Sequence, residues 1–125
     1  MYVVSESERR TTRTPAGVMS GLAGPSQGSA EVSTWRVELG AGKSTPVHII
    51  DREQVWMPLL GVFEVEVDGR VERVGAGQAV ILAAGAVRQL RAVGGGPAEA
   101  LVAMTVGGRA MMPGSEGKIS LPWAE

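Results

Sequence analysis

Short apolar runs alternate with glycine-rich turns along most of the chain. The run at 33–39, "STWRVEL", shows the pattern most cleanly, because Trp35, Val37 and Leu39 fall on one face of an extended chain. The polar residues between them fall on the other face, which is the pattern of a half-buried strand. No window longer than about ten residues holds a helical period, so the whole chain is predicted to be built from strands.

The segment 65–74, "VEVDGRVERV", carries the strongest local signal. Its Asp68-Gly69 pair supplies the positive φ values of a two-residue type I′ turn, and valine-rich runs flank it on both sides. A β-hairpin is therefore predicted there. Just upstream, Pro58 interrupts another apolar stretch. Because proline lacks the N–H that a ladder needs, we expect Pro58 at a sheet edge or a bulge.

Three further runs, at 78–85, 87–93 and 99–106, predict strands separated by glycine- and alanine-rich turns. About eight short strands at roughly ten-residue spacing indicate an all-β sandwich or barrel of the jelly-roll kind.

We expect residues 1–125 to form a single domain, since the chain shows no internal repeat and no composition break. The core barrel is expected at about 33–107, preceded by an N-terminal arm at 1–32. A C-terminal tail at 108–125 would wrap the body, with Trp123 as a possible anchor.

Composition narrows the function classes. The formal net charge is −1 over 125 residues, which predicts no nucleic-acid footprint and no membrane-binding patch. The absence of cysteine excludes disulfides, thiolate metal sites and a cysteine nucleophile. With neither a signal-peptide pattern nor an apolar run long enough to span a membrane, we expect a cytoplasmic protein.

Two short motifs suggest chemistry that their context does not support. "GAGKST" at 40–45 matches the end of a phosphate-binding loop, but Val37 stands where the first glycine belongs, and Pro46 follows where a helix should begin. "GPSQG" at 24–28 matches a nucleophile elbow around Ser26, yet that motif needs a strand–turn–helix of an α/β sheet. Both are interpreted as turns.

From about Trp35 to Val106 the sequence resembles a small single-domain cupin. In the first motif of that family a glycine precedes His-x-His, a glutamate follows and a second glycine closes the strand. Here Gly42 leads to His48, and Gly61 closes the strand. The resemblance implies a cupin-type jelly-roll β-barrel.

The second family motif has a glycine, then Pro-x-Gly, then a histidine. Gly77, Ala83 and Gly85 follow this spacing, and Arg88 occupies the place of the histidine. The framework of both motifs is thus retained.

The family's metal-ligand positions are, by this resemblance, His48, Ile50, Gln54 and Arg88. Only His48 keeps a usual ligand there. Ile50 cannot ligate, and Arg88 brings a permanent positive charge that repels a divalent cation. The resemblance therefore implies neither a metal nor another cofactor, although Asp51 or Glu53 could supply an atypical ligand.

In the cupin register the residues at these positions point into one barrel. Side chains two apart on a strand share a face, which adds Trp56 and Leu90. The expected catalytic residues are His48 and Arg88. The expected substrate-binding residues are Gln54, Trp56, Ile50, Leu90, Trp35 and Met104.

His48 is the only histidine, and its ordinary pKa near neutrality suits a general acid or base; the alternative is a core histidine bonded to a neighbour. Arg88 would anchor a carboxylate, phosphate or enolate oxygen, unless it is a surface-facing strand residue. Gln54 and Trp56 would orient and stack a planar ligand, while Trp56 could equally be plain core. Glu53 is expected to be a solvated acid unless the chain turns it inward.

We expect a metal-independent cupin enzyme that isomerises, cyclises or dehydrates a small organic substrate by acid/base chemistry, of the kind found in specialised-metabolite biosynthesis. The alternatives are a non-catalytic small-molecule-binding cupin and a divalent-metal, dioxygenase-like cupin with an atypical ligand set. The expected partners are a small-molecule ligand and a second copy of the chain. The homodimer follows from the family resemblance, and the apolar start "MYVV" could add to a sheet edge.

Overall fold

The computed structural model describes residues 1–125 and consists of twelve strands and three short 3₁₀ helices. The strands are β1 (Thr11–Arg13), β2 (Gly17–Gly21), β3 (Val32–Leu39), β4 (His48–Ile50), β5 (Gln54–Leu60), β6 (Val62–Val67), β7 (Arg70–Gly75), β8 (Val80–Leu82), β9 (Val87–Val93), β10 (Ala98–Thr105), β11 (Arg109–Met111) and β12 (Ile119–Ser120). The 3₁₀ helices are η1 (Glu8–Arg10), η2 (Pro25–Gln27) and η3 (Pro122–Ala124). None of these helices is long and apolar enough to cross a membrane.

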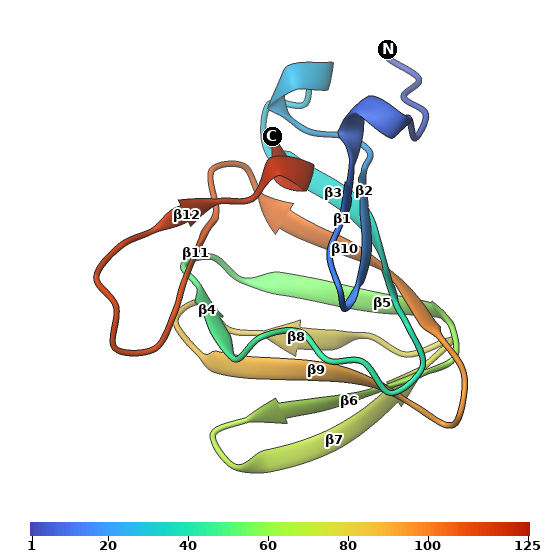
Figure 1. Ribbon diagram of the computed structural model, residues 1–125. Coiled ribbons are helices and arrows are strands. Elements are labelled where there is room, and N and C mark those ends of the chain that lie inside the picture. The colour runs from blue at the N-terminus through green and yellow to red at the C-terminus, as the bar shows by residue number, and fades with distance from the viewer.

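The strands form two six-stranded antiparallel sheets. In Figure 1, β3, β10 and β5 of the first sheet lie above β9, β6 and β7 of the second. The first has the order β1-β2-β3-β10-β5-β8 and the second β12-β11-β4-β9-β6-β7. Strands distant in sequence are neighbours in both sheets, as in a jelly roll. The predicted all-β jelly-roll fold is confirmed.

Alternating burial explains why the central strands face each other across one core. Along β3, Ser33, Trp35, Val37 and Leu39 are buried while the residues between them are partly exposed. β10, which pairs with β3 over its whole length, repeats the pattern. The predicted half-buried strand at 33–39 is therefore confirmed.

The hairpin between β6 and β7 has the predicted turn, since Asp68 and Gly69 both have positive φ, at 52° and 76°. Asp68 is the only non-glycine residue with positive φ. The expectation for Pro58 is also confirmed: the β5–β10 register shifts beside it, and the pairing of β5 with β8 already ends at Trp56. Pro58 thus breaks no ladder.

Gly61 joins β5 to β6 at a position that only glycine fits well. Its φ is +70°, and a Cβ there would collide with the carbonyl oxygen of Pro97. This close approach lets the chain leave one sheet and enter the other within one residue.

The two terminal segments add strands to the sheets on either side of the core barrel. The β1–β2 hairpin extends the first sheet beyond β3, and β11 and β12 extend the second beyond β4. Figure 1 shows the C-terminal segment returning to the N-terminal hairpin, where η3 contacts β1, β2 and β3. Residues 2–4 form no strand, and Tyr2 and Val3 are exposed, because they find no sheet edge within the chain.

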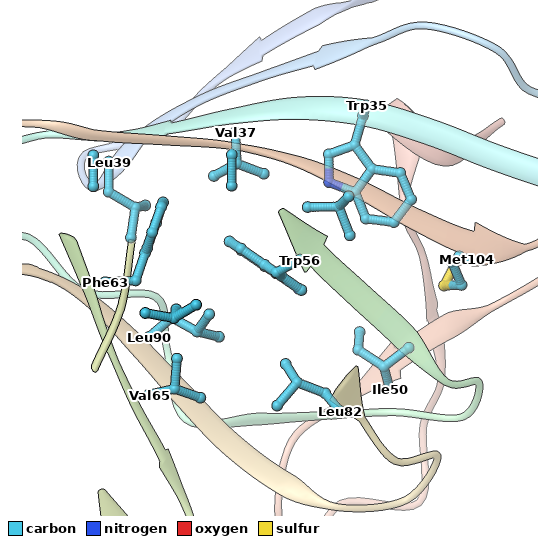
Figure 2. Packing of buried hydrophobic residues seen from close by; sticks show 14 of the residues in the cluster. Trp35, Val37, Leu39, Ile50, Trp56, Phe63, Val65, Leu82, Leu90 and Met104 are labelled. Carbon is cyan, nitrogen blue, oxygen red and sulfur yellow. The ribbon is translucent and has the colours of Figure 1, made fainter. Parts of the chain in front are cut away.

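One hydrophobic cluster of 17 buried residues fills the space between the sheets. Figure 2 shows side chains of β3 and β5 facing those of β6 and β9 across this space. Phe63, Val65 and Leu90 belong to this cluster together with three fully buried alanines, Ala92, Ala98 and Ala100.

Candidate functional site

The register of the second sheet places the two basic residues of the predicted site opposite each other. His48 on β4 and Arg88 on β9 are direct cross-strand partners. Directly paired residues project to the same face of a sheet, so both side chains lie on its inner face. Burial agrees, because Arg88 is 1% exposed and His48 is half-buried. Arg88 is therefore not a surface-facing residue.

Arg88 is held by three hydrogen bonds. Its Nε donates to the carbonyl oxygen of Ala86 at 2.9 Å, and one terminal nitrogen donates to that of Ala83 at 2.7 Å. The other terminal nitrogen donates to Gln54 Oε1 at 3.4 Å. None of the chain's ion pairs involves Arg88. Because burial penalises this uncompensated charge, the pKa of Arg88 falls to about 10, at which the guanidinium is still cationic at neutral pH.

Gln54 links Arg88 to the aromatic wall of the site. Its Oε1 accepts a second hydrogen bond from Trp56 Nε1 at 3.2 Å, so two donors fix the orientation of the amide. The Nε2 amide group finds only the thioether sulfur of Met104, at 3.6 Å. A thioether is a weak acceptor, which leaves Nε2 able to donate to a ligand oxygen. Trp56 in turn meets Phe63 edge to face, with ring centroids 5.7 Å apart.

His48 is held as a neutral imidazole with one free nitrogen. Its Nδ1 lies 2.7 Å from the carbonyl oxygen of Pro46. A carbonyl only accepts hydrogen bonds, so Nδ1 carries the proton and the lone pair resides on Nε2, which has no protein partner. Burial lowers the pKa of His48 and the positive field of Arg88 lowers it further, while the bond to Pro46 acts in the opposite direction.

A cavity of about 800 Å³ opens next to His48, between the two sheets and the terminal segments. Most of its wall is apolar, and all three tryptophans of the chain take part in it. The lining residues are Thr14, Pro15, Ala16, Met19, Trp35, Val37, Leu39, Ser44, Thr45, Pro46, His48, Ile50, Gln54, Trp56, Gln89, Ala110, Met112, Ile119, Ser120, Leu121, Pro122 and Trp123.

The predicted site residues divide into two groups around this cavity. His48, Ile50, Gln54, Trp56 and Trp35 all line it. The other three predicted residues are buried outside the lining: Arg88, Leu90 and Met104. Of these, Arg88 and Met104 contact the lining through Gln54, whereas Leu90 packs in the hydrophobic core.

Sequence reasoning missed the contribution of the chain ends to the cavity wall. The β1–β2 hairpin brings Ala16 and Met19 to the cavity wall, and the C-terminal segment brings Leu121 and Trp123. The only available signals were apolar residues in segments otherwise rich in loop formers, with Trp123 the clearest. Nothing local in those segments indicates the face on which they dock.

The donor set at the family's metal positions does not fit a divalent cation. The guanidinium of Arg88 lies within hydrogen-bond distance of the oxygen of Gln54, which is the one neutral oxygen donor available beside His48. The structure contains no group of three or more His, Cys, Asp or Glu side chains that could hold a metal ion.

The two acids that could have supplied an atypical ligand lie elsewhere. Asp51 accepts hydrogen bonds from the backbone N–H of Arg109 at 2.8 Å and from Lys118 Nζ at 3.0 Å. Its pKa is lowered, because these partners outweigh the cost of its partial burial. Glu53 is exposed at the bend before β5 and does not turn into the barrel. Asp51 thus ties the C-terminal segment to the bend after β4.

Comparison with known proteins identifies relatives of the barrel. The family model described as "Cupin domain" matches residues 35–104. A solved structure of a cupin 2 domain-containing protein from Halorhodospira halophila is similar with a TM-score of 0.74 and 25% identity, covering 85% of this chain and 76% of that one.

Two further solved structures share the fold at lower identity. The polyketide cyclase RemF from Streptomyces resistomycificus has a TM-score of 0.67 and 22% identity, over 82% of this chain and 73% of that one. KdgF from Halomonas sp. has a TM-score of 0.66 and 16% identity, over 76% of this chain and 85% of that one. No curated protein matches the sequence.

Proposed function

The chain belongs to the cupin domain family, and from this premise we propose that it is a metal-independent enzyme that moves a proton on a small organic substrate. One observation carries the proposal: a neutral His48, with Nε2 free, lines a cavity large enough for such a substrate. A lone-pair nitrogen on a group that titrates near neutrality is what general-base catalysis requires.

The proposed step is the abstraction of a proton from a carbon next to a carbonyl group. His48 Nε2 takes the proton and becomes imidazolium, and the electron pair moves onto the carbonyl oxygen as an enolate. Gln54 Nε2 donates a hydrogen bond to this oxygen, and the buried charge of Arg88, 3.4 Å from Gln54 Oε1, stabilises it electrostatically. His48 then returns the proton to the same or another atom.

Returning the proton to a different atom gives isomerisation, while attack of the enolate on a second carbonyl gives cyclisation. Protonation of a leaving hydroxyl gives dehydration. Cyclisation is also the reaction named for one similar structure, the polyketide cyclase, although its 22% identity supports a shared fold alone.

Deuterium exchange at an activated carbon tests the proposal without knowledge of the natural substrate. We expect the protein to accelerate exchange of the protons next to the carbonyl of 2-tetralone, a neutral bicyclic ketone, as followed by NMR in D₂O. His48→Asn keeps a donor for the Pro46 carbonyl and removes the base, so the rate should fall about 10²–10⁴-fold with the fold intact.

Glu72→Gln, an exposed hairpin substitution far from the cavity lining, is the matched control and should exchange at the wild-type rate. Exchange no faster than in buffer would contradict an enzymatic role, and an unaffected His48→Asn variant would contradict the assignment of the base.

A non-catalytic binding role is the second candidate, and the composition of the cavity wall favours it. His48 is the only titratable side chain among the lining residues, so no second acid or base is available to share the proton transfers. This role predicts saturable ligand binding without any exchange of carbon-bound protons.

We infer further that two copies of the chain pair through the outer face of the first sheet. Six uncharged side chains of β5, β8 and β10 point away from the core and form a patch bordered by Glu99 and Arg36; they are Val55, Met57, Leu59, Ile81, Leu101 and Ala103. Such a patch is complementary to its own copy about a two-fold axis. The exposed Tyr2 and Val3 give a second segment that could add to a neighbour's sheet.

Met57→Asp should convert the dimer to a monomer, because it places a charge in the middle of the patch. Light scattering gives the mass in solution, with Glu72→Gln as the control. A monomeric wild-type protein would contradict the pairing.

A further inference from the structure

The cavity wall carries no formally charged side chain. Its 22 residues include no Asp, Glu, Lys or Arg. His48 is its one titratable group, and the Nδ1 atom of His48 lies 2.7 Å from the carbonyl oxygen of Pro46. We propose that the ligand of this cavity is an uncharged, flat and largely apolar molecule with its oxygen atoms gathered at one edge, rather than a small organic acid.

Electrostatics supports an uncharged ligand. A carboxylate entering the cavity would leave water and find no cation on the wall, and an unpaired buried charge is strongly unfavourable. Arg88, the nearest cation in the core, is 1% exposed and already donates to two carbonyl oxygens and to Gln54. Its field can stabilise charge that develops during a reaction, but its guanidinium is not presented to an incoming anion.

The shape of the ligand follows from the aromatic wall and the volume. Trp35, Trp56 and Trp123 are all the tryptophans of the chain, and all three line the cavity. Indole rings offer broad flat faces that suit stacking of planar rings. A cavity of about 800 Å³ lies toward the upper end of the range for drug-sized ligands, which is roughly 300–1,000 Å³. Figure 2 shows Trp35 and Trp56 in the space between the sheets.

The polar lining residues indicate how the ligand is oriented in the cavity. His48 on β4 and Gln54 on β5 both line the cavity, and each brings a side-chain nitrogen that has no strong protein partner. The lining contributed by the C-terminal segment is mainly apolar and includes Leu121 and Trp123. Oxygen atoms of the ligand would therefore lie at the His48 end and its rings toward the C-terminal segment.

This inference rests on the proposed use of the cavity as the ligand site, and it is tested by binding alone. The probes are 2-naphthamide and 2-naphthoate, which share a ring system and differ in charge at neutral pH. Quenching of intrinsic tryptophan fluorescence reports on the cavity, because every tryptophan lines it. We expect 2-naphthamide to bind about tenfold more tightly or better.

A charge introduced into the wall should change this preference. Met19→Lys places a cation on a half-buried lining residue of β2, and it should favour 2-naphthoate, while Met19→Leu should keep the wild-type preference. If Met19→Lys fails to fold, Ser120→Lys tests the same point from an exposed lining residue, with Ser120→Asn as its control.

His48→Asn separates this inference from the catalytic proposal. If His48→Asn loses deuterium exchange but still binds 2-naphthamide more tightly than 2-naphthoate, the inferred ligand class is supported independently of the proposed catalysis. Equal or tighter binding of 2-naphthoate by the wild-type protein would overturn the inference, and so would a lack of quenching by either probe up to its solubility limit.

Discussion

The interior of this barrel has a packed side and a hollow side, and both are built from the same kinds of strand. On the packed side Phe63, Val65 and Leu90 are buried together with Ala92, Ala98 and Ala100, and none of these side chains lines the cavity. On the hollow side equally buried residues, such as Trp35 and Val37, line a cavity of about 800 Å³. Burial by itself therefore does not separate structural from ligand-binding positions.

His48 and Arg88 differ in the same way, although they are direct cross-strand partners. Arg88 is closed off from the cavity, with its donors bound to backbone carbonyls and to Gln54. His48, directly opposite, keeps a free ring nitrogen at the cavity. The buried charge of Arg88 thus lowers the pKa of His48 without itself contacting the cavity.

The largest expected effect comes from introducing the same larger side chain, phenylalanine, on each side in turn. Val65 and Val37 are 4% and 3% exposed, so they form a matched pair. Val65→Phe should lower the free energy of unfolding by about 1–3 kcal/mol or more, because the packed side has no space for the ring. Val37→Phe should cost less than about 1 kcal/mol, since the ring enters existing space. Urea denaturation measures both values.

Val37→Phe should also weaken binding of 2-naphthamide, whereas any variant at Val65 that still folds should bind it normally. Equal losses of stability at the two positions would show that the cavity collapses around its lining and is not an open binding space.

The next effect is a pH dependence of stability that arises from the hollow side. The folded-state pKa of His48 lies below its unfolded value of about 6.5, so the unfolded chain binds more protons between the two values. The contribution of neutral His48 to the free energy of unfolding is fully present above about pH 6.5. It is expected to be lost as the pH drops toward the folded-state pKa of His48. His48→Asn should remove this dependence in urea denaturation series run from mildly alkaline to mildly acidic pH.

The carboxylates provide the internal control for that series. The pKa of Asp51 is lowered, so its contribution is present above its ordinary value of 3.8 and is lost only in more acidic solution. A slope near neutrality that persists in His48→Asn would place its origin outside the cavity.

The smallest effect probes the link between the two sides. Arg88→Met removes the positive charge opposite His48 and keeps an unbranched, though shorter, side chain, so the pKa of His48 should rise. Because the chain contains one histidine, a single set of imidazole NMR signals reports the titration. An unchanged pKa would show that burial alone depresses it, and Glu72→Gln, on the exposed hairpin, should leave it at the wild-type value.

Much of the fold was predictable from local patterns. Alternation of apolar and polar residues located the strand at 33–39, and Asp68-Gly69 located the hairpin turn. The spacing of glycines around His48 and Arg88 indicated the cupin barrel, and strand period then placed both side chains on an inner face. These features depend on residues close together in the chain, which is why sequence alone identifies them.

The division of the interior was decided by contacts between distant segments. Trp35 and Trp123 line one cavity only because the C-terminal segment returns across β3, where Ser33 Oγ donates to the carbonyl oxygen of Ala124 at 2.6 Å. Those residues are 91 positions apart, and no local period encodes such a contact.

The sequence by itself determined the central strands, the barrel and the inner-face positions of His48, Gln54 and Arg88, whereas β1, β11 and β12 were not predicted. Only the tertiary structure decided that Arg88 is closed off while His48 is open to the cavity. The physical reason is that a strand's period specifies which face a side chain takes, whereas the space in front of that face depends on how the whole chain packs.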